Sequence, residues 1–154
     1  ALQDVQGVLK TWERLKAEER ASNGKSEASI LEGVSLALPA LVQAQQYQAR
    51  AGRVGFEWPD IQRVLDKLTE ELVEVQAAQE GDERFFEMGD VLFAAVNLAR
   101  WYQVDAESAL REANIRFRRR FGFIEAAARQ QGRAVSDLLI DEMLEFWGKS
   151  KQQV

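Results

Sequence analysis

Two short groups of carboxylates are the residues best suited to chemistry. The segment EELVE runs from Glu70 to Glu74, and the segment EMGD runs from Glu87 to Asp90. An ionised carboxylate inside a fold costs several kcal/mol unless it is paired, protonated or bound to a cation. Carboxylate oxygens suit a hard divalent ion such as Mg2+ or Mn2+. If these acids converge, the sequence therefore predicts a divalent metal site, which can also bind phosphates.

Composition restricts how such a site could act. The chain of 154 residues contains no histidine and no cysteine. This excludes Ser-His-Asp and Cys-His machinery, thiolate ligands and the Glu-x-x-His pattern of di-iron helical proteins. A hydrolase built from these residues would instead use a metal-bound water with help from carboxylates.

The overall charge and hydropathy pattern indicate the kind of partner. The net charge is -5, so nucleic acid is not the expected partner. The first residues lack the basic and apolar regions of a signal peptide, and no apolar stretch approaches about 18 residues. We expect a soluble, cytoplasmic protein without membrane association.

The elements that position the acids are predicted to be helices. Ala, Leu, Glu, Gln and Arg recur throughout, whereas the chain has 10 Gly, 2 Pro and almost no strand signal. We expect Pro59 in the first turn of one helix, Asp105 as the N-cap of another, and a kink near Gly122. The segment 21–29 has the composition of a flexible connection. The predicted helices span residues 5–20, 40–50, 60–78, 84–102, 105–131 and 136–149.

Helical phase selects among the acids of the helix 60–78. Glu71 and Glu74 share a strip with Lys67 and Ala78, whereas Glu70 lies nearly opposite the core and is predicted to face solvent. Beside this strip runs a predicted core stripe. It consists of Ile61, Leu65, Leu68, Leu72 and Val75.

The helix 84–102 is apolar around most of its circumference and is therefore predicted to be central. Glu87 and Asp90 share a flanking strip, with Asn97 near its edge. Because the preceding break is short, the two helices should pack antiparallel, so that their acidic strips could meet. A single acid pair on a helix is usually a solvated face, and this interpretation stays open. The predicted core stripe consists of Met88, Val91, Leu92, Ala95 and Ala99.

A basic segment, NIRFRRRF, follows at 114–121. Arg116 and Arg120 are four residues apart and therefore lie on one helix face. They either form a solvated face with ordinary salt bridges or bind phosphate oxygens through their guanidinium groups. Two tryptophans, Trp58 and Trp147, lie outside the predicted core stripes and could stack on a base.

The order of these motifs resembles the MazG-type nucleoside triphosphate pyrophosphohydrolases. EELVE, twelve intervening residues and EMGD match the E-x-x-E and E-x-x-D signature of that family. The resemblance extends over roughly residues 36–125. Its consecutive blocks are LPALVQAQQYQARAGRVGFEW, GFEWPD, LDKLTEELVEV, EMGDVLFAAVNLARW and ALREANIRFRRRF.

The resemblance implies an all-α antiparallel helical bundle with a central four-helix MazG-like core, completed by dimerisation. It implies Mg2+-dependent hydrolysis of nucleoside triphosphates between the α- and β-phosphates, giving a nucleoside monophosphate and pyrophosphate, with Mn2+ as a possible substitute metal. Glu74 is the suggested carboxylate for orienting the water. The implied catalytic residues and metal ligands are Glu71, Glu74, Glu87 and Asp90. The implied substrate contacts are Lys67, Asn97, Arg116, Arg120 and Trp147.

The resemblance also implies a division of the chain. Residues 1–35 look like the connector that precedes the second of two tandem domains in many MazG proteins, and residues 36–154 look like the catalytic domain. Arg116 stands where many relatives have lysine, which exchanges a point charge for a planar fork.

Two other functions remain open from the residues. The chain could be a non-catalytic helical interaction module whose acids bind a structural cation or a basic partner. It could also bind nucleic acid through the segment from Arg116 to Arg120. The first alternative predicts metal-dependent stability without hydrolysis, and the second predicts retention of DNA or RNA that weakens with salt.

Overall fold

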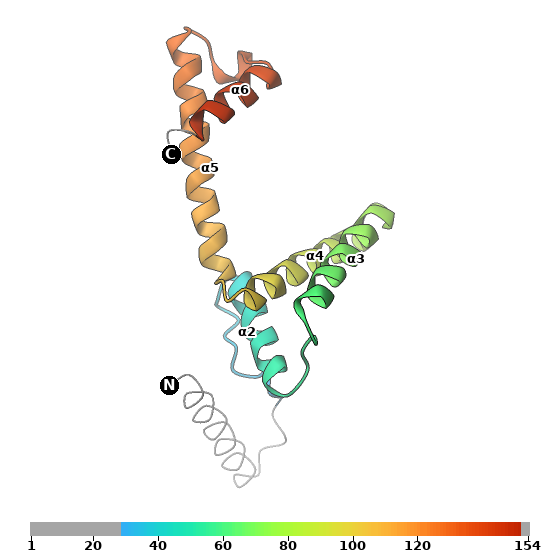
Figure 1. Ribbon diagram of the computed structural model, residues 1–154. Coiled ribbons are helices and arrows are strands. Elements are labelled where there is room, and N and C mark those ends of the chain that lie inside the picture. Colours follow the sequence, from blue (N-terminus) through green and yellow to red (C-terminus); the bar gives the residue numbers. More distant parts are fainter. Residues whose placement is uncertain (1–28, 152–154) are drawn as a thin grey trace.

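The computed structural model describes residues 29–151, and this part of the chain is helical without a strand (Figure 1). The all-α prediction is therefore confirmed. The predicted helix 5–20 and most of the connector lie outside the described residues. No helix within 29–151 is long and apolar enough to cross a membrane. The elements are α2 (Ala40–Arg53), α3 (Ile61–Ala77), α4 (Asp82–Trp101), α5 (Ala106–Gln130), the 3-10 turn η1 (Val135–Asp137) and α6 (Ile140–Ser150).

Local capping explains where α3 and α5 begin. The carboxylate of Asp60 accepts a hydrogen bond from the backbone N–H of Arg63 at 3.0 Å, and Asp105 accepts one from Ser108 at 2.8 Å. The N-cap role of Asp105 is thus confirmed. The placement of Pro59 in the first turn of α3 is wrong, because Asp60 is the cap and Pro59 precedes it.

The C-terminal helices differ from the sequence prediction in two ways. α5 continues as one helix through Gly122, where a kink was expected. The last helix begins at Ile140 rather than near residue 136, because Asp137 accepts a hydrogen bond from the backbone N–H of Ala134 and closes a separate 3-10 turn.

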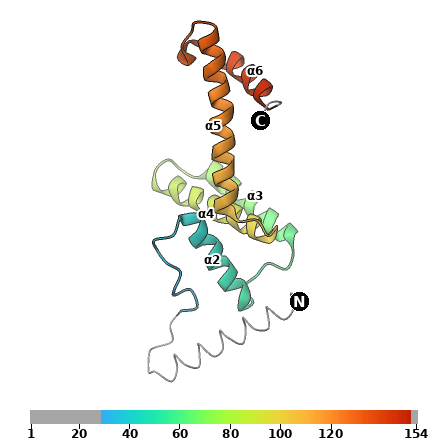
Figure 2. The same ribbon diagram turned by 90° about the vertical axis from the view of Figure 1, so that its left-hand side faces the viewer.

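The helices form two groups at opposite ends of α5 (Figures 1 and 2). α3 and α4 pack side by side as an antiparallel pair, and α2 packs against α4. The side chain of Gln45 on α2 fixes the start of α5, because its amide donates to Val104 O at 3.0 Å and its carbonyl accepts from Ala106 N at 2.9 Å. From there α5 projects away from the α3–α4 pair, and α6 folds back onto its far end.

Each group has its own small core. At the far end of α5, Ile124, Ala128 and Leu138 are buried under the aromatic side chains of α5 and α6. Near α2, the buried residues include Val64 of α3 and Val96 of α4. On α3 an apolar residue, Val64, and an acidic one, Glu71, are both buried against the neighbouring helices.

The predicted core stripe of α3 is confirmed in part, because its residues are partly buried except for Leu72, whereas the stripe of α4 is mostly exposed. Leu72 is 48% exposed and Leu92 is 55% exposed, and Met88 is exposed as well. The buried positions of this segment, Val64, Glu71 and Ala78, lie beside the predicted stripe rather than on it, so the stripe borders the contact instead of forming its centre. The large side chains left exposed on these two helices are Leu72, Val73, Phe85, Phe86, Met88, Leu92 and Phe93.

A fork-shaped ion pair holds the start of α6 and predicts an acid-sensitive step in stability. Arg133 donates to both carboxylate oxygens of Glu142, at 2.7 Å and 3.1 Å. Glu142 also accepts from the backbone N–H of Leu139 at 2.8 Å. The Arg133 guanidinium is the main cause of a fall in the pKa of Glu142 from 4.5 to about 2.

A lowered pKa in the folded state stabilises the protein above the unfolded pKa, and this stabilisation is lost as the pH falls through the folded pKa. We expect the melting temperature to fall between about pH 4.5 and pH 2, and Glu142→Gln to reduce this fall by a few degrees. Circular dichroism melts across this range measure the effect. Glu145→Gln, which removes an exposed pairing with Lys149, is the control. Identical pH profiles for wild type and Glu142→Gln would contradict the prediction.

Candidate active site

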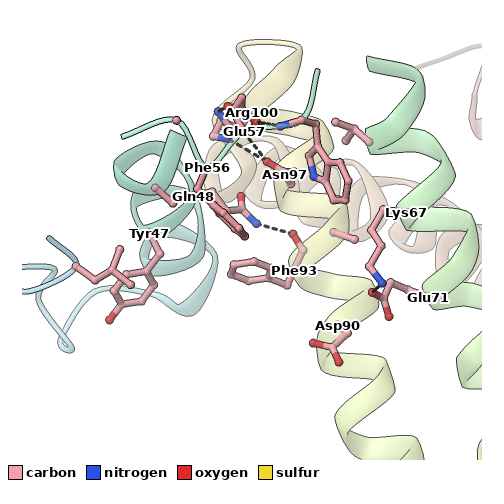
Figure 3. Close-up of a pocket in the computed structure, with 16 residues that line it drawn as sticks. Tyr47, Gln48, Phe56, Glu57, Lys67, Glu71, Asp90, Phe93, Asn97 and Arg100 are labelled. Carbon is pink, nitrogen blue, oxygen red and sulfur yellow. Dashed lines mark hydrogen bonds and ion pairs between the residues drawn. The ribbon is translucent and has the colours of Figure 1, made fainter. Parts of the chain in front are cut away.

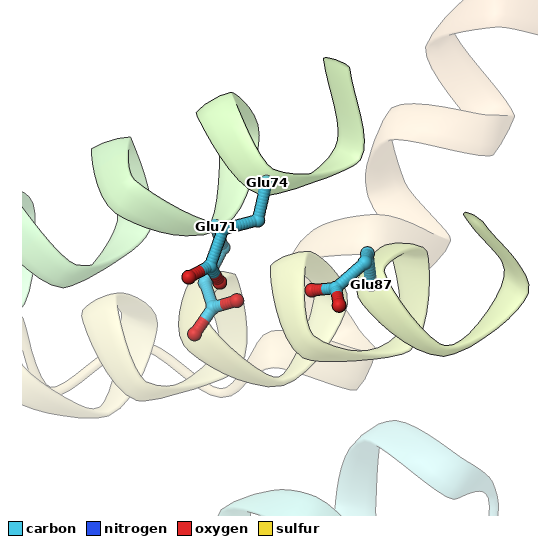
Figure 4. Close-up of side chains that lie close together, drawn as sticks. All are labelled: Glu71, Glu74 and Glu87. Carbon is cyan, nitrogen blue, oxygen red and sulfur yellow. The ribbon is translucent and has the colours of Figure 1, made fainter. Parts of the chain in front are cut away.

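Three carboxylates from two helices meet at one point (Figure 4). One oxygen from each of Glu71, Glu74 and Glu87 lies within 4.8 Å of the others. Glu71 is 6% exposed, whereas Glu87 is half-buried and Glu74 is exposed. The short connection between α3 and α4 makes this meeting possible, because it places the two acidic strips side by side. Such a set of oxygen ligands could hold a hard divalent cation.

Asp90, the fourth acid of the motif, is not part of this tight group. It follows Glu87 by about one turn of α4 and is exposed. Its carboxylate lines the adjoining pocket, as do Glu71 and Lys67 (Figure 3). The structure thus brings three of the four predicted ligands together and places the fourth beside them.

Lys67 lines the pocket next to Glu71. Its Nζ atom lies 2.8 Å from an oxygen of Glu70 and 2.7 Å from an oxygen of Glu71. These two carboxylates raise the pKa of Lys67, so the ammonium group stays charged. Glu70 is exposed, as helical phase predicts. Lys67 therefore supplies a permanent cation at the edge of the acids.

The acids themselves are electrostatically unfavourable neighbours. Contact with Glu71 is the main cause of a raised pKa at Glu74, because two carboxylates close together disfavour double ionisation. The single ammonium group of Lys67 does not offset all of this negative charge. A divalent cation would, and this is the physical reason that the donor set fits a metal.

A pocket of about 490 Å³ adjoins the acids. It lies between α2, the loop 54–58, α3 and α4 (Figure 3). Lys67, Glu71 and Asp90 form its charged end. Tyr47, Phe56 and Phe93 line its other side. Glu57 and Arg100, which form an ion pair, line it as well, so the pocket combines aromatic rings with two groups of charged side chains.

Asn97 lines this pocket and belongs to a network that holds the loop. Arg100 donates to both oxygens of Glu57 at 2.7 Å, and it also donates to Asn97 Oδ1 at 2.8 Å and 3.0 Å. Trp101 Nε1 donates to Glu57 at 3.1 Å. Arg100 is the main cause of a lowered pKa at Glu57. These bonds occupy the carbonyl of Asn97 and leave its NH2 group as the donor it can offer.

Gly52, near the end of α2, lies against the side chain of Glu57 from this loop. A Cβ atom at Gly52 would lie 2.8 Å from Glu57 Oε2, so a larger residue there would require the Glu57 carboxylate to move. Sequence reasoning assigned no role to Glu57 or Arg100. The one available signal was an acid placed between two aromatic residues in the loop GFEWPD.

The predicted phosphate-binding arginines lie elsewhere. Arg116 and Arg120 are on α5, which makes no contact with α3 within the described part of the chain. The guanidinium carbon of Arg120 lies 5.5 Å from the ring centroid of Trp147, and the Phe117 ring lies 5.5 Å from the same tryptophan. Arg120 Nε is buried and has no hydrogen-bond partner among residues 29–151. A single chain thus separates the basic residues from the acids.

Comparisons with known proteins identify relatives of this chain. No family model matches it. The chain is 41% identical over 151 residues to the nucleoside triphosphate pyrophosphohydrolase of Escherichia coli strain K12, which covers 95% of this chain and 57% of that protein. It is 39% identical over 142 residues to the nucleoside triphosphate pyrophosphohydrolase/pyrophosphatase MazG of Thermotoga maritima, covering 92% of this chain and 54% of that protein.

A third relative carries no functional name. The uncharacterized protein YabN of Bacillus subtilis is 38% identical over 156 residues, which covers 98% of this chain and 31% of that protein. The chain therefore spans about half the length, or less, of the curated relatives it matches. Identities near 40% over most of the chain confirm the resemblance to the MazG type that the motif blocks indicate.

Proposed function

We propose that this chain hydrolyses nucleoside triphosphates between the α- and β-phosphates in a Mg2+-dependent reaction that releases a nucleoside monophosphate and pyrophosphate. The observation that carries the proposal is the meeting of Glu71, Glu74 and Glu87 beside a pocket that is charged at one end. The names of the E. coli and T. maritima relatives support it.

The acids would hold Mg2+, with Mn2+ as a possible substitute. The bound ion would neutralise the triphosphate and lower the pKa of a water molecule. Glu71 is the buried member of the group, and its carboxylate is paired with Lys67 at 2.7 Å. Asp90 lies at the pocket edge, where it can complete the ligand set. Glu74 is the exposed member, so we assign it the role of orienting the attacking water.

The pocket would hold the nucleoside with its phosphates toward the acids. Lys67 lies where α3 borders the pocket and would contact a phosphate oxygen. Asn97 would donate its NH2 group to the sugar or base. The aromatic wall formed by Tyr47, Phe56 and Phe93 would cover the apolar faces of the base.

A second copy of the chain would complete the site. α3 and α4 expose several large apolar side chains, among them Leu72, Phe86 and Leu92, and exposed apolar groups of this kind favour association with a second copy. Arg116 and Arg120 belong to α5 and Trp147 to α6, and these two helices form an arm that projects away from the α3–α4 pair (Figure 1). In a symmetric dimer each arm would bring its guanidinium groups to the phosphates held by the acids of the other copy.

Product analysis tests the proposed reaction. The protein is incubated with each ribo- and deoxynucleoside triphosphate and Mg2+, and the products are separated by ion-exchange chromatography. We expect equal amounts of nucleoside monophosphate and pyrophosphate, and no turnover in excess EDTA. Release of nucleoside diphosphate and orthophosphate would contradict the proposal. Metal-dependent stability without any turnover would favour the non-catalytic interaction module instead.

A further inference from the structure

The loop that precedes α2 contributes to the wall of the pocket. We call residues 29–34 of this loop the strap. Leu31 of the strap lines the pocket together with Tyr47 of α2. The side chain of Leu31 is 39% exposed, so burial alone does not fix its position. The sequence assigns residues 1–35 to a connector, and the described end of this connector therefore forms part of the candidate site.

Arg50 of α2 binds the backbone of the strap at three points. Its Nη1 donates to Ile30 O at 3.2 Å and to Glu32 O, and its Nη2 donates to Gly33 O at 3.3 Å. Ile30 and Glu32 directly precede and follow Leu31. One guanidinium group therefore holds the backbone on both sides of the residue that lines the pocket. Hydrogen bonds from a charged donor are stronger than those between neutral groups.

The strap has a defined conformation that turns these carbonyls toward α2. Gly33 has a φ of +86°, in the left-handed region that favours glycine. The backbone N–H of Leu31 donates to Ser29 Oγ at 3.2 Å, and that of Glu32 donates to Ser29 O at 2.9 Å. Val34, at the other end of the strap, is buried. The backbone of the strap is thus held from both of its ends as well as by the guanidinium group.

The strap reaches the pocket on the side away from the acids. Tyr47 and Arg50 are three residues apart on α2, so their side chains leave the helix on the same face. Figure 3 shows Tyr47 across the pocket from Lys67 and Glu71. Leu31, which is held by Arg50 and lines the pocket with Tyr47, therefore belongs to the side where the proposed function places the nucleoside.

We propose that Arg50 is a positioning residue for substrate binding, which holds the strap so that Leu31 covers the nucleoside. This inference rests on the proposed function. The bond that breaks lies between phosphates at the acidic side, so a contact with the nucleoside is equally strong in the substrate and in the transition state. Loss of such a contact raises KM and leaves kcat unchanged.

Steady-state release of pyrophosphate from the best nucleoside triphosphate tests the proposal in two single variants and their double variant. Leu31→Ala removes the contact, and Arg50→Met removes the anchor of the strap. We expect each to raise KM by about 10-fold, the low end of the effect of an apolar contact, because Leu31 is partly exposed. The kcat value should change by less than about two-fold. The double variant should match the larger single effect, because Arg50 acts only through Leu31.

Ile30→Ala is the matched control. Ile30 precedes Leu31 in the strap and is 50% exposed, but it does not line the pocket. The substitution keeps the backbone carbonyl that Arg50 binds, so KM should stay at the wild-type value. A rise in KM equal to that of Leu31→Ala would overturn the assignment of the contact to Leu31.

The other outcomes separate this inference from the proposed function. An unchanged KM in Leu31→Ala, or a loss of kcat without a change in KM, would overturn the role of the strap while hydrolysis stands. Effects that multiply in the double variant would overturn the positioning role of Arg50. If Arg50→Met does not fold, Arg50→Lys replaces it, since lysine keeps the charge and lacks the planar fork. Absence of wild-type turnover with every nucleoside triphosphate would instead overturn the proposed function.

Discussion

We expect Glu71→Gln to lower the turnover of nucleoside triphosphates by at least about 100-fold. Loss of an outer partner of a metal ligand costs about 10- to 100-fold, and loss of a ligand should cost at least as much. Glu71 is the buried member of the acidic group and is also the ion-pair partner of Lys67. The substitution therefore removes one negative charge from the acidic group and breaks the ion pair with Lys67. Steady-state release of pyrophosphate measures the change.

Glu70→Gln is the matched control for this experiment. Glu70 precedes Glu71 in the chain, contacts the same lysine and lies outside the acidic group. It should retain turnover within a few-fold of wild type. Millimolar Mg2+ should also raise the melting temperature of wild type, because a ligand that binds the folded state stabilises it, and this rise should shrink in Glu71→Gln. Equal turnover in the two variants would remove Glu71 from the site.

The second large effect is recovery of activity when two inactive variants are mixed. Arg120→Met should lower turnover by about 100-fold, because it removes a donor that stabilises charge on the phosphates. Glu71→Gln is inactive for a different reason. If acids and arginines come from different copies, a mixed dimer contains one site with both defects and one site with neither.

Mixing the two variants in equal amounts, with subunit exchange, should therefore restore about one quarter of wild-type activity, because half of the dimers are mixed and each has one intact site. Glu71→Gln mixed with Glu87→Gln should show no recovery, since both changes lie in the acidic half. Arg118→Met, on an exposed face of α5, controls for loss of positive charge. No recovery in the first mixture would contradict a site shared between copies.

The acidic group could be predicted from the sequence because its geometry is local. Helical phase separates Glu71 and Glu74 from Glu70, and a short connection between two helices forces their strips together. The N-cap of α5 is local in the same sense, because Asp105 bonds to a backbone group three residues away. Such features depend on a few neighbouring residues and hardly on the rest of the fold.

The remaining features depend on angles between helices, which local patterns do not encode. The apolar stripes of α3 and α4 predict a core within the chain, yet Leu72, Met88 and Leu92 of these stripes are about half-exposed. Arg120 lies far from the acids because α5 points away from them, and no sequence motif predicts the direction in which α5 points. The hydrogen bond from Gln48 to the carbonyl of Phe93 gave no signal either, since the two residues are 45 positions apart in the chain.

Because α5 is one unbroken helix, its length determines how its two ends are oriented relative to each other, and this length should therefore be conserved among relatives. Its 25 residues span roughly 37 Å, with Gln45 clamping one end and the α6 core closing the other. Inserting or deleting one residue between these ends would rotate Arg120 and Trp147 by about 100° relative to α2. Length variation among relatives should therefore be absent from this helix, or occur there in near-whole turns, while the connection between α3 and α4 could vary more freely.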